Sequence, residues 1–150
     1  MPQPVLDPNS LCQVAIVVPD IGKAAAAFAA ILGMPVPQVH VTDGQEQAHT
    51  RYLGRPTPAR ARLAFFRLGP ISLELIEPID SPSTWADQLA SHGPSLHHIA
   101  FNVGNMDQTV ADLEARGLKE VQRGDFAGGC YSYLDGISVL GTTVELLARK

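Results

Sequence analysis

Four polar residues interrupt apolar segments at matching places in the two halves of the chain. Gln13 and His98 lie early in one pair of similar segments, and Glu74 and Glu145 lie inside a second pair. For a single Glu, the ordinary interpretation is the solvent-facing position of an alternating strand, since a buried carboxylate without a partner is costly. If the halves face each other about a pseudo-twofold axis, all four side chains converge. One histidine nitrogen with three oxygen ligands suits a divalent cation such as Zn²⁺, Mn²⁺, Co²⁺ or Ni²⁺, and leaves room for substrate oxygens.

The elements that must position these side chains form a weak internal repeat. Each half begins with a strand, a polar helix cap and an amphipathic helix, and continues with about three strands. The first strands are predicted at 11–18 and 96–103, and the helices at 21–32 and 106–116. Later strands are predicted at 62–68, 71–76, 131–134 and 142–147. The repeat therefore predicts an α+β fold in which an eight-stranded mixed sheet has its helices outside.

The length of 150 residues fits a single domain built from two small repeats. We expect module one at about residues 9–80, a linking helix at about 82–92 and module two at about 94–150. Residues 36–61 are the least regular part, and we expect a weak strand and a mobile loop there. An insertion in one copy of a repeat usually maps to a loop, often a functional one.

Composition and charge exclude several classes of protein. A formal net charge of −4 argues against a general nucleic-acid binder, and no apolar run reaches the about 18 residues of a membrane span. Residues 1–4 lack the basic and apolar regions of a signal peptide, so we expect a cytoplasmic protein. Cys12 and Cys130 cannot make a disulfide framework, and we expect both to be reduced thiols.

Four segments together resemble the vicinal oxygen chelate superfamily, and within it the methylmalonyl-CoA epimerases and glyoxalase I. The segments are Gln13–Ile21, Leu73–Pro78, His97–Phe101 and Val144–Leu147. Their order and spacing carry the resemblance, which extends over nearly the whole chain. It implies two tandem βαβββ modules curved around a cavity, and a divalent metal ion (Zn, Co, Ni or Mn).

The same resemblance implies a ligand set. The metal ligands would be Gln13, Glu74, His98 and Glu145. His98 takes the ligand position because it precedes Ile99 as Gln13 precedes Val14. His97 would then point to the opposite face of its strand, as a packing residue or as a support for a ligand.

Two positions depart from the family pattern. Epimerases of the family usually carry His at the position of Gln13, whereas glyoxalase I enzymes of some lineages carry Gln. Epimerases also use an acidic residue as one of two bases, and Leu63 takes that position here. A single base, Glu145, would still move a proton on one face of the substrate, as the resemblance to glyoxalase I suggests.

The resemblance implies an isomerase, epimerase or lyase that moves a proton on the carbon next to a carbonyl through a metal-stabilised enolate, with Glu145 as catalytic base. The alternative is a non-catalytic small-molecule-binding protein of the resistance type on the same fold. Ring cleavage with Fe²⁺ and O₂ ranks last, because an iron site of that kind usually has two histidine ligands and only His98 lies at a ligand position.

The substrate pocket is expected to draw on Phe65, Arg67, Phe101, Tyr131 and Tyr133. For the aromatic residues, core packing is the plainer interpretation. Five arginines within residues 51–67 are compatible with an anionic carbonyl substrate, although a solvated strand-and-loop edge is the plainer interpretation. Homodimer formation is a further option, and the sequence identifies no interface for it.

Overall fold

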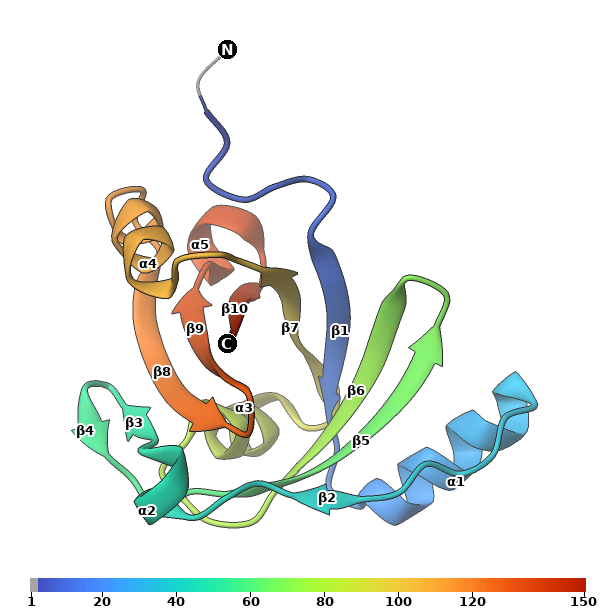
Figure 1. Cartoon of the computed structure of the whole chain (residues 1–150). Helices are drawn as coiled ribbons and strands as arrows, with labels where there is room; N and C mark the ends of the chain where they lie inside the picture. The colour runs from blue at the N-terminus through green and yellow to red at the C-terminus, as the bar shows by residue number, and fades with distance from the viewer. Residues whose placement is uncertain (1–2) are drawn as a thin grey trace.

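A strongly curved mixed sheet runs through residues 3–150, the part of the chain that the computed structural model describes (Figure 1). Its ten strands are β1 (Leu11–Val17), β2 (His40–Val41), β3 (Arg51–Tyr52), β4 (Arg55–Pro56), β5 (Ala61–Leu68), β6 (Ile71–Pro78), β7 (Ser95–Asn102), β8 (Lys119–Phe126), β9 (Gly129–Asp135) and β10 (Thr143–Arg149). They lie in the order β2-β5-β6-β1-β7-β10-β9-β8-β3-β4. Met1 and Pro2, on which the expectation about a signal peptide partly rests, lie outside the described residues.

The two halves of the chain meet at the centre of this sheet. Strands β1 and β7 pair antiparallel there, β6 runs parallel to β1, and β10 runs parallel to β7. Strands β5 and β9 then add antiparallel on either side. The strand order is therefore the same when read outward from the centre in either direction, as the internal repeat predicts.

Ten strands are present among the described residues where eight were expected, because residues 36–61 contribute more than one weak strand. Strands β3 and β4 form a short hairpin whose turn residues, Leu53 and Gly54, both have positive φ angles of 51° and 79°. A turn with two positive φ angles matches the twist of a hairpin. The hairpin pairs with β8 and so covers an otherwise exposed sheet edge. Two-residue strands carry no readable periodicity, which is why the sequence does not reveal them.

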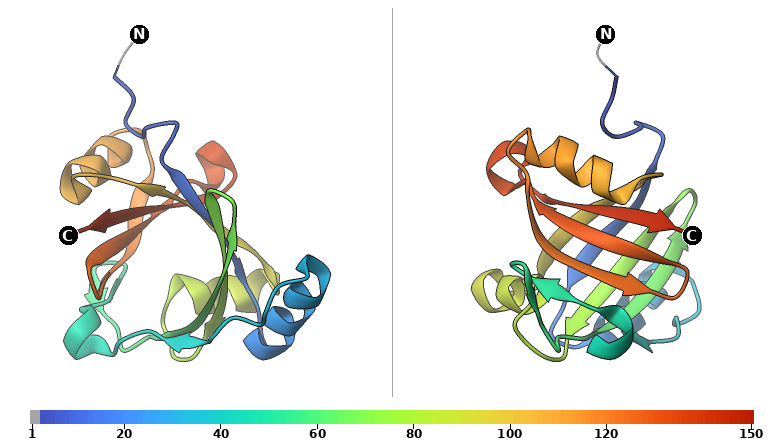
Figure 2. Two further views of the ribbon diagram at one scale, coloured as in Figure 1. Left: turned by 45° about the vertical axis from the view of Figure 1, so that its right-hand side comes forward. Right: turned by 60° about the vertical axis from the view of Figure 1, so that its left-hand side comes forward.

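Five helices accompany the sheet in the described residues and lie on its outside or at its ends (Figure 2). They are α1 (Ile21–Leu32), α2 (Gln45–Ala48), α3 (Thr84–His92), α4 (Met106–Glu114) and α5 (Ile137–Leu140). The caps follow the sequence pattern: Asp20 accepts from the Lys23 amide and Asn105 from the Gln108 amide. No helix within residues 3–150 has both the length and the apolar character needed to span a membrane.

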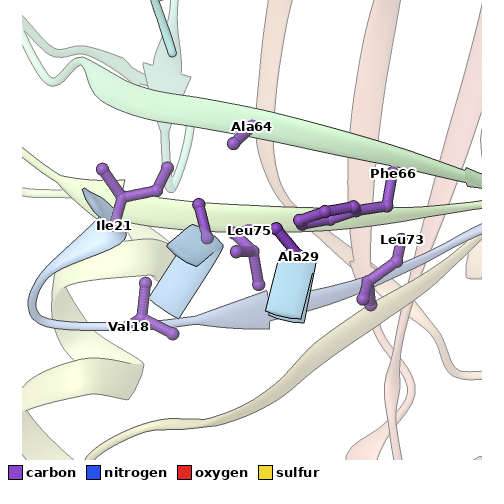
Figure 3. Close-up of a cluster of buried hydrophobic side chains, with 8 residues drawn as sticks. Val18, Ile21, Ala29, Ala64, Phe66, Leu73 and Leu75 are labelled. Atoms are coloured by element: carbon purple, nitrogen blue, oxygen red, sulfur yellow. The ribbon is translucent and has the colours of Figure 1, made fainter. Parts of the chain in front are cut away.

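Each half has its own hydrophobic core between a helix and the convex face of the sheet. Helix α1 buries Ile21, Ala25 and Ala29 against Phe66 and Leu75, as Figure 3 shows in part. Helix α4 in the same way buries Met106, Val110 and Leu113 against Leu134 of β9 and Val144 and Leu146 of β10. Packing both helices on the convex side leaves the concave side of the sheet free to form a cavity.

Candidate active site

The register of the central strands brings the four polar residues onto one face of the sheet. Ala15 of β1 lies between Glu74 on β6 and His98 on β7. Ala100 of β7 lies between Gln13 on β1 and Glu145 on β10. Both alanines are completely buried, and their small side chains leave space above them for the larger polar groups.

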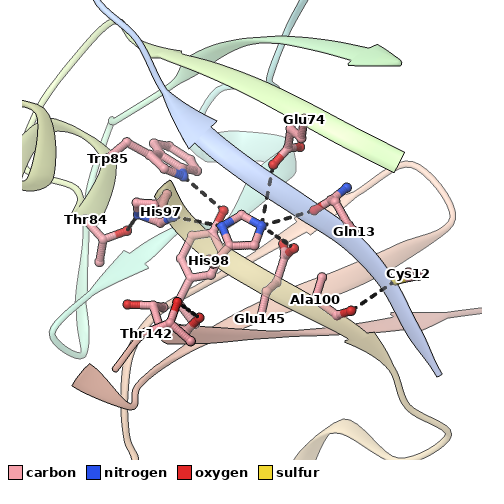
Figure 4. A network of polar contacts seen from close by, with 12 residues as sticks. Cys12, Gln13, Glu74, Thr84, Trp85, His97, His98, Ala100, Thr142 and Glu145 are labelled. Atoms are coloured by element: carbon pink, nitrogen blue, oxygen red, sulfur yellow. Dashed lines mark hydrogen bonds and ion pairs between the residues drawn. The ribbon is translucent and has the colours of Figure 1, made fainter. Parts of the chain in front are cut away.

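The four side chains meet around one nitrogen atom (Figure 4). The Nε2 atom of His98 lies 2.8 Å from Oε2 of Glu145, 3.1 Å from Oε1 of Gln13 and 3.6 Å from Oε1 of Glu74. His98 is fully buried and the other three are at most 8% exposed. The structure thus places together the four residues that the repeat predicted to converge.

Simple alternation along β7 predicted that His97 points to the face opposite His98, and the structure does not place it there. The pairing with β1 shifts by one residue between His98 and Leu96, so His97 is the extra residue of a β-bulge. A bulge re-aims a side chain without ending the strand. As a result the Nδ1 atoms of His97 and His98 are 2.8 Å apart, and His97 is buried beside His98 rather than packed across the sheet.

Burial sets the protonation states of this cluster. It raises the pKa of Glu145 to about 8, and the positive charge of Arg149 acts in the opposite direction. It also raises the pKa of Glu74 well above its usual range, and negative charge on Glu145 raises that pKa further. It lowers the pKa of His98 to about 3. These shifts favour the neutral forms of the three side chains while no cation is bound.

We expect the metal-free chain to lose stability as the pH rises from about 6.5 to about 8. A carboxyl group with a raised pKa binds more protons in the folded chain than in the unfolded chain, so its contribution is lost as the pH rises through the folded pKa. His98 and His97, whose pKa values are lowered to about 3, act in the opposite direction, but only below about pH 6.5. Glu145 alone accounts for about 2 kcal/mol over this interval, at about 1.4 kcal/mol per pH unit.

Urea unfolding in a chelating buffer at several pH values measures this slope. The Glu145→Gln variant, which has no titrating group at this position, should show a clearly flatter dependence. An equal slope in the variant would show that another group causes it.

The donor set fits a divalent metal ion by its chemistry. Oε1 of Glu74 and Oε2 of Glu145 are buried and receive no hydrogen bond from protein groups within residues 3–150. Two such acceptors beside an imidazole nitrogen that an amide oxygen also contacts are typical of a cation site. The arrangement is not a finished site, because in this part of the chain no three His, Cys, Asp or Glu side chains already have metal-binding geometry. Binding an ion therefore requires deprotonation and some rotation of the two glutamates.

A cavity of about 260 Å³ opens above the cluster on the concave face of the sheet. Gln13, Glu74 and Glu145 lie in its floor. Its other lining residues are mostly apolar or aromatic: Leu63, Phe65, Trp85, Phe126, Tyr131, Tyr133, Leu147 and Arg149. A larger groove of about 500 Å³ lies elsewhere, along α3 and the β3–β4 hairpin, but none of the four clustered residues lines it. The smaller cavity is therefore the candidate active site.

The expected substrate-binding residues divide into two groups. Phe65, Tyr131 and Tyr133 line the cavity, whereas Arg67 and Phe101 do not. Phe101 packs into the core beneath α4, because it lies on the opposite face of β7 from His98 and Ala100. Arg67 is exposed near the end of β5, beyond the lining residues. Leu63, at the position where an acidic residue was considered, does line the cavity and makes that wall apolar.

Arg149 and Phe126 are cavity residues that the sequence analysis missed. Arg149 is the only cationic side chain among the lining residues, and its guanidinium lies 5.8 Å from the centre of the Phe126 ring. Alternation along β10 would have identified it, since Glu145, Leu147 and Arg149 occupy every second position of that strand. The cavity therefore has an acidic floor and one positive charge in its lining.

Comparison with known proteins agrees with this architecture. Residues 12–133 match the family model described as Glyoxalase/Bleomycin resistance protein/Dioxygenase superfamily. Bovine mitochondrial methylmalonyl-CoA epimerase is 28% identical over 120 residues, and a 2-epi-5-epi-valiolone epimerase from Actinomyces sp. is 32% identical over 104 residues. The matches cover 77% and 69% of this chain but only 59% and 56% of those two relatives.

A solved structure supports the fold. The crystal structure of methylmalonyl-CoA epimerase from Mycobacterium tuberculosis superposes with a TM-score of 0.66 at 19% sequence identity. The match covers all of this chain and 93% of that one. At this identity the likeness establishes a shared fold.

Proposed function

Because the chain belongs to the glyoxalase/bleomycin resistance protein/dioxygenase superfamily, we propose that it is a divalent-metal-dependent enzyme that moves a proton on the carbon next to a substrate carbonyl. The observation that carries this proposal is the cluster of Gln13, Glu74 and Glu145 around Nε2 of His98 at the floor of a cavity. The epimerases among the similar proteins support an enzyme of the isomerase or epimerase kind.

Gln13, Glu74, His98 and Glu145 are the residues that would hold the ion. A bound divalent ion supplies a Lewis acid that polarises the substrate carbonyl and stabilises the negative charge that develops on its oxygen. The four side chains would set the position of the ion, since the oxygens of Gln13, Glu74 and Glu145 lie 2.8–3.6 Å from Nε2 of His98.

Glu145 is the proposed base. Its carboxylate lines the cavity, with Oε2 2.8 Å from Nε2 of His98, where it can accept a proton from the substrate carbon and return it. The apolar and aromatic walls of the cavity favour binding of the carbon part of a substrate beside this carboxylate. Leu63 lines the cavity at the position where an acidic residue was considered, so one base is available there. One base is expected to move a proton between neighbouring carbons on one face of the substrate, rather than to invert a single carbon.

The metal content of the purified chain provides the first test. We expect about one divalent ion per chain by inductively coupled plasma mass spectrometry after exposure to Zn²⁺, Mn²⁺, Co²⁺ or Ni²⁺. A Glu74→Ala, His98→Ala double variant should retain none. An ion retained by the double variant would show that the metal site lies elsewhere. If neither chain binds an ion, the protein is not a metalloenzyme.

Deuterium exchange tests the chemistry itself. Methylmalonyl-CoA, the glutathione adduct of methylglyoxal and 2-epi-5-epi-valiolone are suitable probes in D₂O, since each carries a hydrogen next to a carbonyl or its equivalent. Incorporation of deuterium at that carbon, followed by NMR, supports the proposal. Tight binding of a probe with no exchange supports instead a non-catalytic small-molecule-binding protein, a reading favoured by the predominantly aromatic cavity wall.

Arg149 is expected to bind the anionic group of the substrate. It is the one positive charge in the cavity lining, and within residues 3–150 no carboxylate forms an ion pair with it. Arg149→Gln should raise KM for a carboxylate-bearing probe about tenfold with little change in kcat, because the contact is present before and during reaction. Arg67→Gln, outside the cavity, is the matched control. An equal rise in KM for both variants would assign the effect to general surface charge.

A further inference from the structure

We propose that the hydroxyl group of Tyr133 donates a hydrogen bond to the substrate oxygen that gains negative charge during proton transfer. The inference rests on the proposed function and adds a catalytic residue to it. It gives a chemical role to a cavity residue whose ring otherwise serves packing.

The register of β9 and β10 places Tyr133 beside the polar cluster. Tyr133 pairs directly with Glu145 across the two strands, and directly paired side chains lie on the same face of a sheet. The Tyr133 ring packs on the imidazole of His98, with a centroid distance of 4.9 Å. Tyr133 and Glu145 both line the cavity, so a molecule bound at Glu145 lies next to this tyrosine.

A hydrogen bond from Trp85 determines how the Tyr133 hydroxyl is used. The indole Nε1–H of Trp85, which points towards the cluster in Figure 4, donates to Oη of Tyr133 over 2.9 Å. An indole nitrogen is a donor only, so the tyrosine oxygen must be the acceptor in this bond. The hydrogen of the Tyr133 hydroxyl group therefore remains for another partner.

This hydrogen has no acceptor within residues 3–150. The Trp85 indole is the one hydrogen-bond partner of the Tyr133 hydroxyl in that part of the chain. Tyr133 is only 3% exposed, and most buried polar groups in proteins have their hydrogen-bond partners. Since Trp85 and Tyr133 both line the cavity, the unused donor belongs to the cavity wall. An acceptor atom of a bound molecule can therefore satisfy it.

Tyr131, the second tyrosine of the cavity, differs in both respects. Its hydroxyl accepts from the side-chain amide of Gln122 over 3.0 Å and has the buried Thr50 side chain as a further hydrogen-bond partner. In the sheet it pairs with Leu147 rather than with Glu145. The unused donor thus lies on the tyrosine that is paired with the proposed base.

A fixed donor beside the base has a direct catalytic use. When a proton leaves the carbon next to a carbonyl, negative charge develops on the carbonyl oxygen. A donor that is already in place stabilises this charge more than it stabilises the neutral carbonyl. The Trp85 hydrogen bond and the contact with His98 hold Tyr133 in place before the reaction. The arrangement favours, as a substrate class, carbonyl compounds whose oxygen is accessible to a hydrogen-bond donor.

Tyr133→Phe tests this role, because it removes the hydroxyl group and keeps the ring that packs on the histidines. We expect kcat for deuterium exchange into a substrate probe to fall about 10²-fold, with KM within about threefold of the wild-type value. NMR of the probe in D₂O at a saturating divalent ion measures both quantities. A higher KM with unchanged kcat would overturn the catalytic role.

Trp85→Phe separates donation to the substrate from loss of the Trp85–Tyr133 hydrogen bond. Both variants lose that bond and should lower the stability of the fold, whereas Trp85→Phe keeps the tyrosine hydroxyl. Its kcat should therefore fall by less than about tenfold. An equal fall of kcat in the two variants would assign the effect to the altered cavity wall and refute the inference.

Binding of acetohydroxamate provides a readout that does not depend on turnover. This small molecule places negative charge on oxygen as an enolate does, and Trp85, the only tryptophan of the chain, can report its binding by fluorescence. In the Co²⁺-loaded protein we expect Tyr133→Phe to weaken acetohydroxamate binding about tenfold and to leave the affinity for Co²⁺ alone unchanged.

Three outcomes of this titration would overturn the inference. They are equal acetohydroxamate affinity in the two chains, no binding to either chain, and weaker binding of Co²⁺ alone in Tyr133→Phe, which would mean that the hydroxyl supports a metal ligand instead. If Co²⁺ does not bind even the wild-type chain, the proposed function fails. The same titration without the ion then still decides the role of the hydroxyl by the same comparison.

Discussion

Glu145→Gln is expected to lower the rate of proton exchange with solvent by about 10³-fold for any probe that the wild-type protein turns over. The substitution keeps the size of the side chain and its oxygen, but removes the group that accepts and returns the proton. Glu145 is buried and lines the cavity, with its Oε2 atom 2.8 Å from Nε2 of His98.

The measurement is deuterium incorporation into the probes named above, at saturating metal ion, with probe binding measured in parallel. Binding should change much less than exchange, because the aromatic walls and Arg149 are untouched. Glu46→Gln, on exposed helix α2, is a matched control that makes the same chemical change away from the cavity and should leave exchange unaltered.

Two outcomes would contradict the role of Glu145. Exchange that persists within a few-fold of wild type would mean that another group removes the proton, and Glu74 would be the next residue to test. Loss of the metal ion in Glu145→Gln, with exchange restored by a higher ion concentration, would assign Glu145 a ligand role without a base role.

Trp85→Ala is expected to destabilise the fold by about 3–5 kcal/mol. Trp85 is 3% exposed and is the residue through which helix α3 reaches the cavity end of the sheet. It packs with Ala15, Ala61 and Ile76 from the first half and with Tyr133 from the second, so its removal opens a void between the halves. Its indole N–H also donates to the Tyr133 hydroxyl over 2.9 Å.

Urea unfolding measures this loss, and Trp85→Phe divides it into parts. The phenylalanine keeps most of the apolar contact but loses the hydrogen bond to Tyr133, and should cost about 1–3 kcal/mol. A loss below 1 kcal/mol in Trp85→Ala would mean that the site collapses around the void. Because Tyr133 packs on both histidines, Trp85→Ala should also disturb the His98 resonances.

The elements of both halves were predictable because local physical chemistry determines them. The strand at 11–18 and the helix at 21–32 form as β1 and α1, since alternation, the Asp20 cap and the left-handed Gly33 at the helix end agree with one another. The matching elements at 96–103 and 106–116 form as β7 and a helix α4 that ends at Glu114. The repeat predicted the convergence of Gln13, Glu74, His98 and Glu145, and they converge because their strands β1, β6, β7 and β10 are neighbours at the centre of the sheet.

Contacts distant in sequence decided the rest. The β-bulge at His97 depends on how β7 pairs with β1, the β3–β4 hairpin forms against β8, and the short bond between the histidines exists only in the folded chain. The residue types of Phe101 and Arg67 suggested a place in the pocket. Arg67 lies outside the cavity lining, and Phe101 packs into the core on the other face of β7.

The sequence alone determined the fold class, the two repeated halves and the four polar residues that converge, because periodicity, capping and repeat symmetry are local or pairwise properties. Only the tertiary structure decided which residues line the cavity, that Arg149 is the positively charged residue among them, and that His97 contacts His98. These depend on register and curvature of the sheet, where a shift of one residue moves a side chain to the other face.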